Sequence, residues 1–253
     1  MVRYFNLPHG HNWKRRILLC TALCLCGCVA AVEAQTADVT VRVDFAVPAG
    51  KNHVPAASPV AVAWLTPLGA DSARIPPAQA HTYRMVQENK TFEPHLLVVP
   101  VGSLVQFPNH DPFFHNVFSL YNGKRFDLGL YETGSERGVR FDREGVSYIF
   151  CDIHPEMGAV ILALSTPHYA VSRGGAIVIQ NVPPGRYMLN FWSEGATQES
   201  QTAARKPVTI GATDSDLGSV TLVATPSPMA HHANKFGESY PATKDSGSTG
   251  SKY

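Results

Sequence analysis

Hydrophobic and polar residues alternate with a period of two in short stretches along much of the chain. The first two stretches are residues 39–45 (VTVRVDF) and 59–65 (PVAVAWL). Residues 82–166 contain further stretches, separated by residues typical of turns: YRMVQEN, HLLVVPVGSLVQFPN, HNVFSL, GVRFDREGVSYIF and GAVILALS. This alternation predicts short strands joined by turns. Because no stretch of 82–166 combines a helical period with helix caps, we expect an all-β fold.

Changes in composition divide the predicted strands into segments. Residues 69–81 (GADSARIPPAQAH) are typical of a linker, and after Pro167 the stretches GGAIVIQ and NVPPGRY begin another group of antiparallel strands. The strand signal ends near Ala224, and the residues beyond it are rich in Ser, Gly, Thr, Pro and Lys. We therefore expect strand-bearing segments followed by a disordered tail, with the boundaries 35–81, 82–166, 167–225 and 226–253.

Residues 1–34 have the order of a secretory signal peptide. Basic residues from Lys14 to Arg16 precede an apolar run at 17–32, and Ala34 ends a small-residue cleavage site. A run of about 16 apolar residues is shorter than the roughly 20 that span a bilayer, which argues against a membrane anchor. We expect an exported, periplasmic protein with the signal removed near Ala34. The segment around Cys28 loosely resembles a lipobox, so membrane association stays open only through acylation of Cys28.

Composition and charge narrow the possible partners. The chain has 253 residues, of which 44% are hydrophobic, enough for one large core or two small ones. Its net charge is +1 and 16% of its residues are charged, so it lacks the basic field that binds a nucleic acid. Four of the five cysteines lie in the predicted signal, which leaves Cys151 as the single thiol of the exported chain. A lone thiol in an oxidising compartment needs an explanation.

The segment that follows the apolar stretch 146–150 offers an explanation for this lone thiol. Cys151, His154 and Met157 lie three residues apart, a spacing that a tight turn can fold so that a thiolate, an imidazole and a thioether converge. A second imidazole would come from His110 or His115, about 36 to 41 residues upstream. His115 is favoured because it opens a strand, whereas His110 lies between Asn109 and Asp111 and suits a turn. Whether His110 has a metal role stays open.

Two imidazoles, a thiolate and a weak axial thioether form the trigonal site of blue-copper electron-transfer proteins. Methionine is a poor zinc ligand, which disfavours structural zinc. Copper-handling proteins use clusters of Met and His, whereas the methionines after the signal are scattered: Met85, Met157, Met188 and Met229. Multicopper oxidases use repeated His-x-His motifs, and the one such motif lies in the signal at His9. We therefore expect a copper protein that is not an enzyme.

The stretches SYIFCDIHPEM and VQFPNHDPFFHNV resemble the cupredoxins, and the Cys-x-x-His-x-x-Met spacing is similar to that of amicyanin. This resemblance implies a Greek-key cupredoxin sandwich over about 82–166 with one type 1 copper per chain. It implies His115, Cys151, His154 and Met157 as the copper ligands. Asn116 would hydrogen-bond near the cysteine sulfur and tie the two ligand loops together.

The flanking segments resemble a second family. The stretch GGAIVIQNVPPGRYMLNFWSEG, together with VTVRVDF and PVAVAWL, is similar to carboxypeptidase regulatory-like domains, which are small transthyretin-like β-sandwiches. The resemblance implies that the cupredoxin segment is inserted between two halves of this second sandwich. Such domains are structural or interaction modules, so no catalysis is expected from it.

The function implied by these resemblances is one-electron transfer between transient redox partners, such as a cytochrome c-like protein or a dehydrogenase. In cupredoxins the electron usually passes at the edge of the C-terminal histidine, here His154, through an apolar patch. That patch would include Phe113, Phe114, Ile153 and Pro155. Weak docking through a small interface fits the low net charge. The alternative is a periplasmic copper-handling protein without an electron-transfer role.

Overall fold

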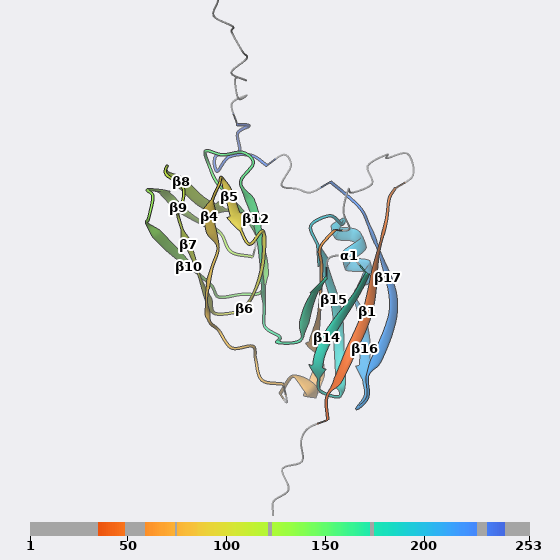
Figure 1. The fold of residues 1–253 in the computed structure, drawn as a ribbon. Helices are drawn as coiled ribbons and strands as arrows, with labels where there is room; N and C mark the ends of the chain where they lie inside the picture. Colours follow the sequence, from red (N-terminus) through yellow and green to blue (C-terminus); the bar gives the residue numbers. More distant parts are fainter. Residues whose placement is uncertain are drawn as a thin grey trace, which may run out of the picture. The chain divides into compact units, whose positions relative to one another are not determined.

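The computed structural model describes residues 35–48, 59–73, 75–120, 123–172, 175–226 and 232–240, all of which belong to one compact unit. The predicted signal peptide, residues 1–34, lies outside the described residues. Apart from one short α-helix and one 3-10 turn, the regular elements are strands, so the predicted all-β fold class is confirmed (Figure 1). Among the described residues, no helix has the length and apolar character needed to cross a membrane.

The first and last thirds of the chain form two sheets together. In the three-stranded sheet, β1 (Ala37–Ala46) lies between β14 (Gly175–Val182) and β17 (Ser215–Val223). The four-stranded sheet has the order β13 (Tyr169–Ser172), β2 (Ala61–Pro67), β15 (Gly185–Ser193) and β16 (Lys206–Ile210). The alternation of β1 explains its place, because Val39, Val41 and Val43 are buried while Arg42 and Asp44 are exposed. These valines share one core with Leu65, Leu189 and Tyr187.

The middle of the chain forms the sheets that carry the predicted site. A five-stranded sheet has the order β6 (Leu96–Pro100), β12 (Gly158–Leu164), β11 (Gly145–Phe150), β8 (His115–Ser119) and β9 (Phe126–Tyr131). A three-stranded sheet has the order β10 (Glu136–Phe141), β7 (Ser103–Pro108) and β3 (Thr82–Arg84). The short pair β4 (Val86–Glu88) and β5 (Thr91–Glu93) completes this part. Side chains from these strands, including Phe92, Phe107, Phe141 and Ile149, form a second core.

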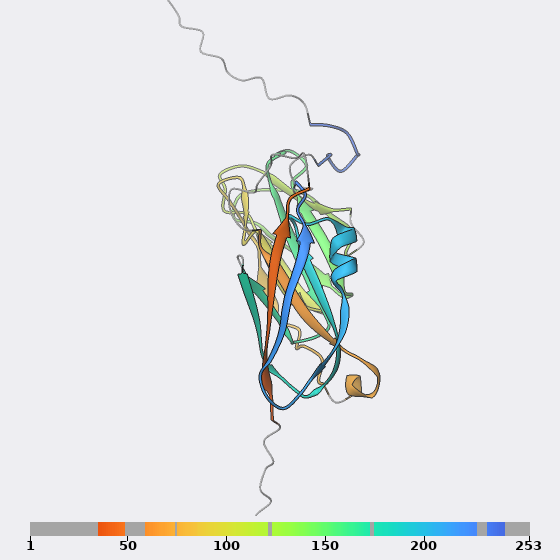
Figure 2. The ribbon, with the colours of Figure 1, turned by 90° about the vertical axis from the view of Figure 1, so that its right-hand side faces the viewer.

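The antiparallel pairing predicted for the strands after Pro167 is wrong for β17, and two pairs of the middle segment are parallel as well. β1 runs parallel to β17, β6 to β12 and β3 to β7. Figure 2 shows β1 and β17 side by side with their arrows pointing the same way. Alternation of apolar and polar residues fixes which face of a strand is buried, but it carries no information on the direction of the neighbouring strand.

Two further elements differ from the sequence expectation. The linker contains the 3-10 turn η1 (Gly69–Ala73), and the last third contains α1 (Gln198–Ala204), where strands and turns were expected. Thr197 caps α1, since its hydroxyl accepts a hydrogen bond from the backbone amide of Ser200 at 3.2 Å. The helix has seven residues and buries none of them, so no hydrophobic stripe of helical period marks it in the sequence.

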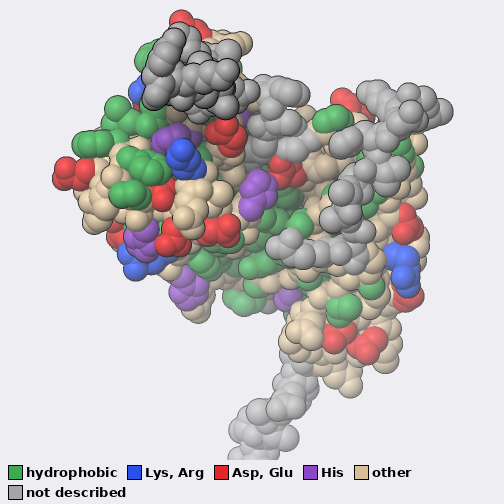
Figure 3. All heavy atoms as spheres, turned by 45° about the horizontal axis from the view of Figure 1, so that its top comes forward, with side chains coloured by type: hydrophobic (Ala, Val, Ile, Leu, Met, Phe, Trp, Pro, Cys, Tyr) green, Lys and Arg blue, Asp and Glu red, His purple; other side chains and the backbone are tan. Residues whose placement is uncertain are grey.

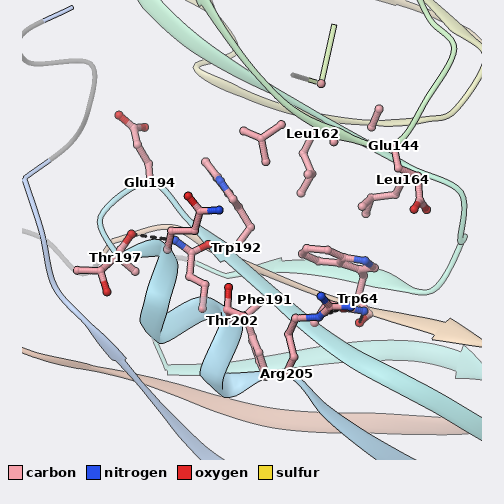
Figure 4. Close-up of a pocket in the computed structure, with 18 of the residues that line it drawn as sticks. Trp64, Glu144, Leu162, Leu164, Phe191, Trp192, Glu194, Thr197, Thr202 and Arg205 are labelled. Carbon is pink, nitrogen blue, oxygen red and sulfur yellow. Dashed lines mark hydrogen bonds between the residues drawn. The ribbon is translucent and has the colours of Figure 1, made fainter. Parts of the chain in front are cut away.

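Strands of the middle segment also contact strands of the outer segments. A third cluster joins Val62 and Trp192 to Val98, Val160, Leu162 and Leu164 on β6 and β12. Beside this cluster lies an open pocket of about 1080 Å³, lined by side chains of β2, β11, β12, β15 and α1 (Figure 4). The walls include Trp64 and Trp192, and Arg205 and Glu194 bring charge to its rim.

Candidate metal centre

Sheet order brings the two halves of the predicted site together. β8 and β11 are antiparallel neighbours with Phe150 opposite Phe118, so the start of β8 at His115 lies beside the residues that follow β11. β11 and β12 form a hairpin in which Phe150 is opposite Gly158, and the residues between them, 151–157, make the loop at its end. Two backbone hydrogen bonds fold this loop, from Cys151 N–H to Met157 C=O at 3.3 Å and from Met157 N–H to His154 C=O at 3.1 Å. The loop therefore turns Cys151 and His154 toward the start of β8.

Three donor atoms meet at this end of the sheet. Cys151 Sγ lies 3.7 Å from His115 Nδ1 and 3.6 Å from His154 Nδ1, and the two Nδ1 atoms are 3.1 Å apart. A triangle with these sides has a centre about 2 Å from each atom, which is close to the length of a metal–imidazole bond. His115 and Cys151 are fully buried, and His154 is partly exposed. Among the described residues, this is the one group of three His, Cys, Asp or Glu side chains that could hold a metal ion.

The hydrogen-bond chemistry of the triangle fits a cation at its centre. His115 Nε2 lies 2.7 Å from Asp111 Oδ2, and because a carboxylate only accepts, Nε2–H donates to it. The Nδ1 lone pair of His115 then points at His154 Nδ1, 3.1 Å away. Two imidazole nitrogens and a sulfur thus face one point, and a metal ion there would be bound by all three donors. The residues present therefore fit a soft metal ion.

The surroundings of Cys151 disfavour a free thiolate but would stabilise a metal-bound one. Burial raises the pKa of the Cys151 thiol, so the metal-free site holds it protonated. Backbone amides of Asn116, Ile153 and His154 donate to it and act in the opposite direction. Oriented amides of this kind stabilise negative charge on sulfur once a cation replaces the proton.

His154 is in the form that a metal requires. Burial, followed by the charges of His115 and Lys90, lowers the pKa of His154. A neutral imidazole has a free lone pair, and metal ligation needs that form of the ring. Phe113 packs against both imidazoles, with ring centroids 5.2 Å from His115 and 5.6 Å from His154. The rings are thus held by packing as well as by hydrogen bonds.

The other predicted site residues lie close by, with one exception. Met157 is fully buried at the end of the loop, in the same core as Cys151. The side-chain amide of Asn116 donates to Asp127 Oδ1 at 2.7 Å, and its backbone amide is the part that bonds the thiol. His110 is exposed and does not belong to the triangle, and its backbone amide donates to Gln87 C=O at 2.9 Å.

Two features of the site were missing from the sequence interpretation. The first is Asp111, which was treated only as a turn residue beside His110. Its position four residues before His115 was the available signal. Burial opposes its ionised form, but hydrogen bonds from the backbone amide of Lys90, from His115 and from the backbone amide of Asn89 outweigh burial and lower the pKa of Asp111. Asp111 is therefore a buried carboxylate directly behind His115.

The second feature is a piece of the tail that was expected to be disordered. Residues 232–240 lie against the loop 151–157, called the ligand loop from here on. Tyr240 Oη donates to Cys151 C=O at 2.7 Å, and Lys235 N–H donates to Asp152 Oδ1 at 3.0 Å. Lys235 Nζ also lies 3.0 Å from Asp127 Oδ2, and the His232 ring stacks on Phe150. No sequence signal marks these contacts, because the partners lie more than 80 residues away along the chain.

Exposed apolar side chains directly precede both histidines of the triangle in the chain. Phe114 and Ile153 are 54% and 46% exposed, large fractions for side chains of this kind. Figure 3 shows hydrophobic side chains at the surface, interspersed with histidine and charged side chains.

Comparisons with known proteins give partial matches only. No protein-family model matches the chain. No curated protein matches it either. Among solved structures, a purple cupredoxin from Nitrosopumilus maritimus is 26% identical, with 32% of this chain and 99% of that chain covered and a TM-score of 0.30. A copper-containing nitrite reductase from Thermus scotoductus SA-01 is 22% identical, with 39% and 27% covered and a TM-score of 0.32. A reduced amicyanin variant is 20% identical, with 33% and 82% covered and a TM-score of 0.31.

Proposed function

We propose that this chain is a type 1 copper protein that binds one copper ion and carries single electrons between redox partners. The observation that carries the proposal is the buried triangle of Cys151 Sγ, His115 Nδ1 and His154 Nδ1, with sides of 3.1 to 3.7 Å. Two imidazoles, one thiolate and a nearby thioether, here Met157, are the donor set typical of such centres. The bound copper would supply the one-electron redox chemistry.

The surrounding residues favour electron transfer because they hold the donors still. Asp111 fixes the ring of His115, the folded loop fixes Cys151 and Met157, and Phe113 packs against His154. Donors that do not move between two oxidation states need little reorganisation when an electron arrives. His154 is partly exposed among apolar side chains, which suits a small, transient docking interface.

We propose an electron carrier in preference to an enzyme because of the donor count. Activation of a substrate by a metal ion needs an open coordination position. Here three donors already surround the centre, and the fourth candidate, Met157, is fully buried in the same core as Cys151.

We propose further that the chain is exported and that the copper-binding segment is inserted in a transthyretin-like sandwich. The basic residues, apolar run and small-residue site of 1–34 support export, and burial of Cys151 would protect its lone thiol in an oxidising compartment. The pairing of β1 and β2 with β13 to β17 supports the insertion. Mass spectrometry of protein recovered from a periplasmic fraction tests the export proposal, with Gln35 as the expected first residue. A mass that includes residues 1–34 would contradict it.

The electron-carrier proposal is tested by the visible and EPR spectra of the Cu(II)-loaded protein, alongside Cys151→Ser. We expect an intense blue thiolate-to-copper band and narrow parallel hyperfine splitting, both lost in the variant because the thiolate is gone. A pale spectrum with normal splitting would overturn the proposal. Tight Cu(I) binding without colour in the Cu(II) form would favour copper handling instead.

A further inference from the structure

A buried carboxylate stands directly behind one of the two imidazoles. The side chains of His115 and Asp111 are 0% and 6% exposed, and His115 Nε2 lies 2.7 Å from Asp111 Oδ2. His154, the other imidazole of the triangle, lies partly at the surface. The two nitrogen donors of the candidate centre are therefore in different electrostatic surroundings.

The orientation of Asp111 is fixed by groups that do not belong to the triangle. Its Oδ1 accepts from Asn89 N–H at 2.7 Å and its Oδ2 accepts from Lys90 N–H at 2.9 Å. Asn89 and Lys90 have φ of 55° and 57°, so the turn between β4 and β5 is left-handed and turns both amides inward. The backbone of Asp111 is held too, because its N–H donates to Asn109 Oδ1 and its C=O accepts from Thr133 Oγ1.

From this geometry we infer that Asp111 is a positioning residue for the centre, which fixes the His115 ring with Nδ1 toward the metal and favours Cu(II) over Cu(I). This inference rests on the proposed function. A carboxylate that accepts from the outer N–H of a ligand imidazole fixes the tautomer and raises the basicity of the ligand nitrogen. Its negative charge stabilises the ion of higher charge more than the ion of lower charge, and low solvent access leaves that charge weakly screened.

The test compares the copper reduction potential of the wild type with that of Asp111→Asn. Removing an outer partner of a ligand histidine typically lowers metal affinity about 10- to 100-fold. We expect affinity for Cu(II) to fall at least about tenfold more than affinity for Cu(I), which is a rise of about 59 mV in potential. The matched control is Glu156→Gln, which removes an exposed carboxylate next to Met157. For this control we expect the ratio of the Cu(II) and Cu(I) affinities to change by less than about twofold, or about 18 mV in potential, because solvent screens the charge.

A second measurement needs neither the variant nor copper. In metal-free wild-type protein at neutral pH, the ¹⁵N chemical shifts of His115 report which nitrogen carries the proton. We expect the Nε2–H tautomer, with a proton that exchanges slowly with water. A His115 ring protonated at Nδ1 would overturn the inference even if Asp111→Asn does not fold.

The outcomes separate this inference from the proposed function. A wild type without the blue spectrum refutes the electron-carrier proposal, while the tautomer of His115 still tests the role of Asp111 in orienting the ring. A blue wild type whose potential shifts equally in Asp111→Asn and Glu156→Gln overturns the inference and leaves the copper site intact. A large rise in the reduction potential of Asp111→Asn, without a similar rise in Glu156→Gln, supports both the role of Asp111 and the proposed function.

Discussion

At the scale of single residues, two buried methionines allow the thioether to be tested by itself. Met157 and Met85 are both fully buried in the same core, but only Met157 belongs to the ligand loop. We expect Met157→Leu to raise the reduction potential by about 59 mV or more, a tenfold change, because a weak donor to Cu(II) is lost. Cyclic voltammetry on the copper-loaded variant measures this shift.

Met85→Leu is the matched control for that prediction. Both substitutions nearly conserve volume, so each should cost less than about 1.5 kcal/mol in the unfolding free energy of the metal-free protein. Met85→Leu should leave the potential unchanged. Equal potentials in the two variants would show that Met157 does not act on the metal.

The grouping of His115, Cys151 and His154 could be predicted from the sequence because it depends on local relations. Cys151, His154 and Met157 lie within one turn, and His115 opens the strand that pairs with the one before Cys151. Asp111 was missed because its role depends on the amides of Asn89 and Lys90, which belong to a turn more than 20 residues upstream. Choosing His115 over His110 required only the strand pattern, whereas finding its carboxylate partner required the packed fold.

At the scale of elements, the segment 232–240 should stiffen the ligand loop. Tyr240 and Lys235 each hydrogen-bond the loop, and Lys235 also pairs with Asp127, which accepts from Asn116 on β8. One segment therefore bonds the loop 151–157 directly and reaches β8 through Asp127 on β9. We expect a chain that ends at Pro226 to show faster amide hydrogen exchange at residues 151–157 than a chain that ends at Tyr240, because net hydrogen bonds of about 1 kcal/mol each are lost.

Exchange measured far from the loop shows whether the loss of residues 232–240 acts on the loop alone. Exchange in β1 and β17 should be the same in the two chains, because their pairing does not involve residues 232–240. Metal-free protein should be used, so that metal affinity does not contribute. Identical exchange at 151–157 in the two chains would mean that the segment does not restrain the loop.

The elements themselves were predicted unevenly, for reasons that differ between them. The valines of β1 and the apolar run of β12 mark strands clearly, since burial imposes a period of two or a continuous apolar stretch. The short helix α1 buries no residue, so no apolar stripe in its sequence predicts it. Residues 232–240 contain too few apolar side chains to predict packing, and polar hydrogen bonds hold them instead.

At the scale of the whole molecule, an ion pair links the strands of the middle segment to the outer sheet. His95, just before β6, lies 2.6 Å from Glu194 at the end of β15, and its Nδ1 lies 3.1 Å from Gly158 C=O. The hydrogen bond to Glu194 is the main cause of a raised pKa for His95, against the effect of burial. The pair therefore couples protonation of His95 to the contact between the two parts of the fold.

The sign of the pH effect follows from that shift. A folded-state pKa above the unfolded value of about 6.5 means that the stabilisation is complete below about pH 6.5 and is lost as pH rises through the folded pKa. The side chain of His95 is 55% exposed, so solvent screening limits the contribution to about 0.2–1 kcal/mol.

Thermal unfolding of metal-free protein at pH 5.5 and 8.5 should show a stability loss at the higher pH that is smaller in Glu194→Gln. His95→Gln should remove the same pH-dependent part of the stability. The double variant should lose no more of this pH-dependent stability than either single variant. A wild type and a Glu194→Gln variant with the same pH dependence would mean that this pair does not join the two parts, and the apolar cluster around Trp192 and Leu162 would then have to hold them together.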